Sequence, residues 1–130
     1  MPRNLALIID RDEAVRALLA EVLHDEGWQT VTLSVMPQCQ DVAGLSPTLI
    51  ILELWQEQAA NDLLARLGRS NDGSMPPIML TSTNSELLEQ LRDDNGQNYY
   101  PALLKPFRME VLLHLLKRAV GSHQERVPCL

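Results

Sequence analysis

The sequence predicts an α/β fold, a doubly wound three-layer sandwich in which helices cover both faces of a five-stranded parallel sheet. Short, continuously apolar segments recur along the chain, which is typical of strands that are buried on both faces. Segments with apolar residues at helical spacing lie between them. Because strand and helix alternate five times, each strand is expected to join a parallel sheet through a helical crossover.

The predicted strands differ in pattern. Four are short apolar runs, whereas the second alternates between apolar and polar residues. The predicted strands are 5–9, 28–33, 49–52, 78–80 and 102–104.

The helices between these strands are marked by their ends as well as by their periodicity. Asp12 is suited to cap the first helix and Gly27 to end it. The other predicted helices are 36–45, 59–67, a helix capped by Asn84 or Ser85 and ended by 93–96, and 108–120. We expect one domain over residues 1–120 and a flexible C-terminal tail over 121–130, which leaves no room for an output domain.

The overall charge narrows the choice of partners. The 130 residues carry a formal net charge of -6, and the sequence pI is about 4.9. Binding to nucleic acid or to an anionic membrane requires a basic surface, so we expect neither partner.

The two cysteines are far apart, and no Cys/His cluster has metal-ligand spacing. The apolar N-terminal run is too short for a signal peptide, and we expect a cytoplasmic protein.

Polar residues stand at the C-terminal ends of four of the apolar strands. Asp10 and Glu53 end the first and third strands, Thr81 ends the fourth, and Lys105 follows the fifth. In a parallel sheet these ends lie side by side at one edge, and this edge is where ligands bind in open α/β sheets. The four residues are therefore the candidate site.

Four segments at this edge resemble, in order and spacing, the receiver domain of bacterial two-component response regulators. They are 7–12 with its acidic cluster, 47–53 with the strand that ends at the phosphoacceptor, 77–82 with the switch hydroxyl, and the Lys-Pro-Phe of 105–107. The resemblance covers residues 4–120, roughly the whole predicted domain.

The resemblance implies a flavodoxin-like, CheY-like fold and a role in signal transduction or a phosphorelay. In that family an aspartate accepts a phosphoryl group from a histidine kinase, nearby acids hold Mg2+, and a Lys and a Thr/Ser hydroxyl contact the phosphoryl oxygens. The equivalent positions here are Glu53 for the phosphoacceptor, Asp10 and Arg11 for the acidic pocket, and Thr81 and Lys105 for the phosphoryl contacts. The family's partner face is formed by the last two helices and the fifth strand, through which members often dimerise.

Three substitutions depart from the family pattern where its chemistry takes place. Glu53 replaces the acceptor aspartate, Arg11 replaces an acid, and Ala102 replaces the aromatic residue that the switch moves. A guanidinium has only donors and cannot ligate Mg2+, which requires oxygen ligands. The longer Glu53 also displaces its carboxylate, and a misplacement of about 1 Å can cost on the order of 100-fold in rate. Mg2+ binding is expected to be weak or lost, and no other cofactor is expected.

The same substitutions predict what fills the pocket. The formal charges of Asp10, Arg11, Glu53 and Lys105 cancel, and Glu53 is long enough to reach Lys105 or Arg11. We therefore expect an internal ion-pair cluster in place of metal and phosphate. Arg11 is also compatible with a solvated side chain that points away, and Thr81 with a role in capping the next loop.

We interpret the chain as an atypical receiver domain, or pseudo-receiver, that is not an enzyme and signals through protein–protein contact. Its partners would be a histidine kinase or a downstream signalling protein, and a homodimer is compatible with the sequence. Glu53 either imitates the phosphorylated state or belongs to a vestigial pocket, which the alanine at 102 favours. Two alternatives remain: phosphorylation at Glu53 or at a nearby hydroxyl such as Ser82, and a small-ligand-binding flavodoxin-like protein.

Overall fold

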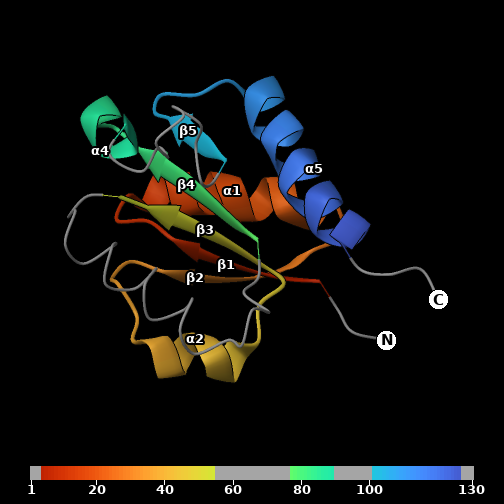
Figure 1. The fold of residues 1–130 in the computed structure, drawn as a ribbon. Coiled ribbons are helices and arrows are strands. Elements are labelled where there is room, and N and C mark those ends of the chain that lie inside the picture. Colours follow the sequence, from red (N-terminus) through yellow and green to blue (C-terminus); the bar gives the residue numbers. More distant parts are fainter. Residues whose placement is uncertain (1–3, 55–76, 90–100, 127–130) are drawn as a thin grey trace.

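The computed structural model describes residues 4–54, 77–89 and 101–126 (Figure 1). Strands and helices alternate along these residues, as the sequence predicted. The strands are β1 (Leu5–Ile9), β2 (Gln29–Leu33), β3 (Leu49–Glu53), β4 (Ile78–Ser82) and β5 (Ala102–Leu104). The helices are α1 (Glu13–Asp25), α2 (Cys39–Leu45), α4 (Ser85–Glu89) and α5 (Met109–Arg126).

The strands form one parallel sheet in the order β2-β1-β3-β4-β5. In its register Ile51 of β3 lies beside Ile8 of β1 and Met79 of β4. The same register places Glu53 beside Thr81. The doubly wound α/β fold is confirmed, and the C-terminal ends of the strands meet at one edge.

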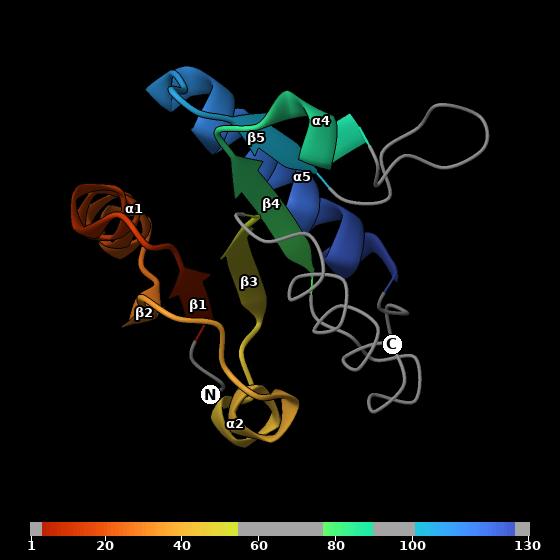
Figure 2. The ribbon, with the colours of Figure 1, turned by 90° about the vertical axis from the view of Figure 1, so that its left-hand side faces the viewer.

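Alternate strand residues supply two separate cores, one on each face of the sheet. Figure 2 shows α1 and α5 on one face and α2 on the other. The core on the first face combines Ile8 and Ile51 with residues of α1 and α5 such as Leu19 and Leu112. The core on the opposite face combines strand residues with Val42 of α2. Burial on both faces explains why four of the five strands read as continuous apolar runs.

The first helix begins and ends where its sequence signals indicate. The Asp12 side chain accepts hydrogen bonds from the backbone N–H groups of Ala14 and Val15, at 2.9 and 3.4 Å. These are donors that a helix N-terminus leaves without intrahelical partners. Gly27 follows the helix with φ of 90°, a left-handed conformation that favours glycine.

The other helices agree less closely with the expected boundaries. The helix expected over 36–45 begins only at Cys39, because Pro37 disfavours a helical conformation for the residue before it. The helix expected over 59–67 lies outside the described residues. So does the expected end of the fourth helix at 93–96.

The last helix is longer than expected. The sequence placed the end of this helix at Val120, but α5 continues through Arg126. The flexibility expected over 121–130 stays a prediction. Gly121 costs about 1 kcal/mol relative to alanine but keeps its backbone N–H, and so does not break the helix.

No helix in the described residues is both long enough and apolar enough to cross a membrane.

Packing of α1 on the sheet can be tested with two adjacent leucines. Leu19 is fully buried, whereas the Leu18 side chain is 38% exposed. Leu19→Ala is expected to lower the free energy of unfolding by about 2–5 kcal/mol, because it leaves a cavity in the core. Leu18→Ala, the matched control, should cost about 1 kcal/mol or less. Urea unfolding measures both, and equal losses would contradict the burial of Leu19 against the sheet.

Candidate functional site

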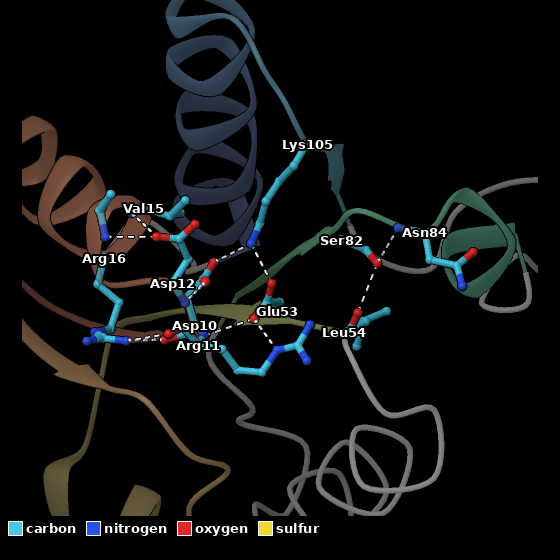
Figure 3. A network of polar contacts seen from close by, with 11 residues as sticks. Asp10, Arg11, Asp12, Val15, Arg16, Glu53, Leu54, Ser82, Asn84 and Lys105 are labelled. Atoms are coloured by element: carbon cyan, nitrogen blue, oxygen red, sulfur yellow. Dashed lines mark hydrogen bonds and ion pairs between the residues drawn. The ribbon is translucent and has the colours of Figure 1, made fainter.

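Two acids and one cation meet at the C-terminal edge of the sheet (Figure 3). Asp10 directly follows β1 and Glu53 ends β3, the neighbouring strand, while Lys105 directly follows β5. Asp10 is 1% exposed and Glu53 is 3% exposed. The strand order thus brings together three residues that are more than 40 positions apart in sequence.

Lys105 bridges the two carboxylates. Its Nζ lies 2.8 Å from Asp10 Oδ2 and 2.5 Å from Glu53 Oε2. The Lys105 side chain is itself only 9% exposed. The contact with Glu53 is a charge-assisted hydrogen bond, one of the strong interactions in a protein interior, whereas the contact with Asp10 Oδ2 is an ion pair without hydrogen-bond geometry.

Arg11 provides the remaining contacts of Glu53. Its backbone N–H donates to Glu53 Oε1 at 2.9 Å, and its side-chain Nε lies 3.4 Å from the same oxygen. The Arg11 side chain is 55% exposed, so it covers the outer side of the buried carboxylate. The ion pairs that the sequence predicted for Glu53, with Lys105 and with Arg11, are both present.

Asp10 is held by the loop that follows it. Its Oδ1 accepts the backbone N–H of Asp12 at 2.8 Å, and its Oδ2 contacts Lys105. Each of the four oxygens of Asp10 and Glu53 therefore contacts an N–H or ammonium donor of the chain itself.

Sequence reasoning missed Arg16, which fixes the same loop. Its Nη1 donates to the backbone carbonyls of Asp10 and Arg11, at 2.7 and 3.1 Å. Long side chains on a helix point back towards its N-terminus. An arginine one turn after the cap residue Asp12 was therefore the signal in the sequence.

The two hydroxyls at the end of β4 differ in their partners. Thr81 is fully buried beside Glu53 in the sheet register, yet its Oγ1 has no hydrogen-bond partner among the described residues. Ser82, also fully buried, donates from Oγ to the carbonyl of Leu54 at 2.9 Å. Its Oγ also accepts the backbone N–H of Asn84 at 3.0 Å. Sequence reasoning singled out Thr81 as the switch hydroxyl and considered Ser82 only as a small residue and as an alternative phosphorylation site.

The pKa values of the three central groups shift in directions that follow from this geometry. Burial raises the pKa of Glu53, but the hydrogen bonds from Lys105 and Arg11 and their charges outweigh it, so the pKa lies below its ordinary value. For Asp10 burial prevails over Lys105 and raises the pKa. Burial lowers the pKa of Lys105, but the two carboxylates outweigh it and the net shift is upward.

This donor set does not fit Mg2+. The metal would have to take the place of Lys105, whose ammonium lies between the carboxylates of Asp10 and Glu53 where a cation would bind. Arg11 places a guanidinium, which has no lone pair to offer, beside Glu53. Among the residues that the structure describes, no group of three or more His, Cys, Asp or Glu side chains could hold a metal ion.

No protein-family model matches the chain, but its sequence is similar to those of curated regulatory proteins. The transcriptional regulatory protein CpxR of Escherichia coli is 30% identical over 128 residues, which are 95% of this chain and 53% of CpxR. The DNA-binding transcriptional regulator NtrC of a Bradyrhizobium strain is 26% identical over 129 residues, 98% of this chain and 26% of that protein. The chain thus spans about half or less of the length of these relatives.

The fold has close counterparts among solved structures. The signal receiver domain of a LuxO repressor protein from Vibrio parahaemolyticus aligns with a TM-score of 0.75 at 16% identity. The alignment covers 95% of each chain, and at this identity it supports the fold alone. Together with a response regulator of the NtrX-like type from Rickettsia bellii, which is 28% identical over 116 residues, it confirms the resemblance carried by the four segments at the sheet edge. Over nearly its whole length the chain is thus similar to receiver domains in fold and to two-component response regulators in sequence.

Proposed function

We propose that this receiver domain is a pseudo-receiver: it does not accept phosphate in the usual way, binds Mg2+ weakly or not at all, and signals through contact with another protein. The proposal includes that it is not an enzyme and acts in the cytoplasm. The observation that carries it is the contact of all four oxygens of Asp10 and Glu53 with donors of the chain itself. A metal ion or a phosphoryl group would have to displace these donors, above all the ammonium of Lys105, before it could reach the carboxylate oxygens.

The arrangement supports a vestigial pocket over one in which Glu53 imitates a phosphorylated aspartate. An active-state imitation would engage the switch hydroxyl, but Thr81 Oγ1 has no hydrogen-bond partner among the described residues. Ala102 packs against the core as a small side chain, so that position has no aromatic ring to move. Neither the hydroxyl of Thr81 nor an aromatic side chain at position 102 can therefore couple the charge of Glu53 to the partner face.

The alternative of phosphorylation within the same pocket has less support. Glu53 Oε2 is held by the ammonium of Lys105, and Oε1 by Arg11. Ser82, the nearby hydroxyl, is fully buried and its oxygen is already bonded to two backbone groups. No observation on the described residues favours a small-ligand site of another class.

The proposed partner face is formed by α4, β5 and α5. Three large apolar side chains of β5 and α5 are well exposed there: Leu104 at 47%, Met109 at 37% and Val111 at 44%. We propose that a histidine kinase, a downstream signalling protein or a second copy of the chain covers them. The formal net charge of -6 argues against nucleic acid and against an anionic membrane.

The experiment that tests this function is an amide NMR titration with Mg2+ and then with beryllofluoride, which imitates a phosphoryl group. We expect no clustered shifts at Asp10, Glu53, Thr81 or Lys105. Clustered shifts at these residues would contradict the proposal. The positive control is the double variant Arg11→Asp/Glu53→Asp, which restores an acidic oxygen set and is expected to gain Mg2+-dependent shifts.

The cluster itself can be tested by removal of its cation. Lys105→Met keeps the length of the side chain but leaves two buried carboxylates without a cationic bridge. At pH 7 the free energy of unfolding should fall by about 3–5 kcal/mol. Lys117→Met, at an exposed lysine of α5, is the matched control and should change it by no more than about 0.5 kcal/mol. Equal effects in urea unfolding would show that Lys105 does not neutralise the two acids.

The fall in the free energy of unfolding that Lys105→Met causes should depend on pH. Because the pKa of Glu53 is lower in the folded chain than its ordinary 4.5, its contribution to stability is present above that value and is lost as the pH falls. The raised pKa of Asp10 acts in the opposite sense, since burial of its charge costs stability above 3.8. The contribution of Lys105 is lost as the pH rises beyond 10.5. The difference between the wild-type chain and Lys105→Met should be largest between pH 4.5 and 10.5.

The vestigial reading makes a separate prediction for the partner face. Glu53→Gln removes the charge of the phosphoacceptor position and should leave binding of a partner, or self-association, unchanged within about twofold, because no relay transmits it. Isothermal titration calorimetry or sedimentation measures this. A loss of binding of tenfold or more would support the locked-on alternative instead.

A further inference from the structure

Ser82 lies between the ion-pair cluster and the start of α4. Its backbone carbonyl accepts the N–H of Lys105 at 2.8 Å, and its Oγ donates to the carbonyl of Leu54 at 2.9 Å. Leu54 directly follows Glu53. Ser82 is thus hydrogen-bonded to Lys105 itself and to Leu54, the neighbour of Glu53, so it lies next to the ion pair between Lys105 and Glu53 (Figure 3).

The same hydroxyl reaches forward into the connection between β4 and α4. Ser82 Oγ accepts the backbone N–H of Asn84 at 3.0 Å. The Asn84 side chain in turn accepts the N–H of Glu86 in the first turn of α4 at 2.9 Å. A short chain of hydrogen bonds therefore runs from the carbonyl of Leu54 to the beginning of the helix.

Movement of this connection would carry a specific cost. Ser82 is fully buried and Leu54 is 4% exposed. If the start of α4 moved away from β3, the buried hydroxyl would lose the N–H of Asn84, and if Ser82 moved with it, the carbonyl of Leu54 would lose its donor as well. Unpaired buried groups of this kind are costly, whereas the bonded arrangement uses both the donor and the acceptor of the hydroxyl.

We propose that Ser82 is a positioning residue that holds the β4–α4 connection in one arrangement relative to β3, so that the face formed by α4, β5 and α5 is constitutive and not switched. The proposal rests on the proposed function only for the identity of that face. In this proposal the hydroxyl of Ser82 determines the position of α4, and Thr81 has no part in it.

The test compares Ser82→Ala with Ser85→Ala, the same substitution at an exposed serine three residues along the chain. In Ser82→Ala we expect amide hydrogen exchange of Asn84 to become about fivefold faster. NMR relaxation dispersion should reveal new microsecond-to-millisecond exchange over residues 83–89. Ser85→Ala should show neither change, because the described residues give its hydroxyl no hydrogen bond to lose.

Two outcomes would overturn the proposal: wild-type protection and no new exchange in Ser82→Ala, or equal changes in both variants. If Ser82→Ala does not fold, Ser82→Cys keeps a side chain of similar shape with a poorer hydrogen-bonding group and must show the same two changes. The unmodified chain gives a further check, since the amide of Asn84 must exchange more slowly than that of Thr83. These measurements need no partner or phosphodonor, so their failure is distinguishable from a failure of the proposed function.

Discussion

The site depends on one ammonium group held between two buried carboxylates. Lys105 can reach Asp10 and Glu53 together only because β1 and β3 are neighbours and β5 ends at the same edge of the sheet. Buried charges are tolerated when they are paired and hydrogen-bonded, and the backbone N–H groups of Arg11 and Asp12 add one hydrogen bond to each carboxylate. The charges of the pocket are therefore balanced by groups of the chain itself.

Much of this arrangement could be predicted from the sequence because it follows from strand periodicity. The apolar runs located four strands, and their parallel pairing placed Asp10, Glu53 and Lys105 at one edge. The length of Glu53 predicted an ion pair with Lys105 or Arg11, and although the sequence also allowed Arg11 to point away, the structure contains both pairs. These are short-range consequences of residue type and register.

The sequence was less informative where a contact depends on side-chain direction. Nothing in the pattern distinguished the hydroxyl of Thr81, which lacks a partner among the described residues, from that of Ser82, which has two. The role of Arg16 also depends on its conformation over the helix N-terminus. The end of α5 was misjudged because Gly121 was read as a stop signal, although glycine weakens a helix without breaking it.

The unequal burial of the two cations around Glu53 has a consequence for the response of the site to dissolved salt. Attraction between buried charges is screened only weakly by ions in solution, whereas contacts of exposed side chains are screened within roughly 10 Å. Lys105 is almost enclosed, and the Arg11 side chain is more than half exposed. Changes in ionic strength would therefore loosen the outer contact of Glu53 first and leave the inner bridge to Asp10 in place.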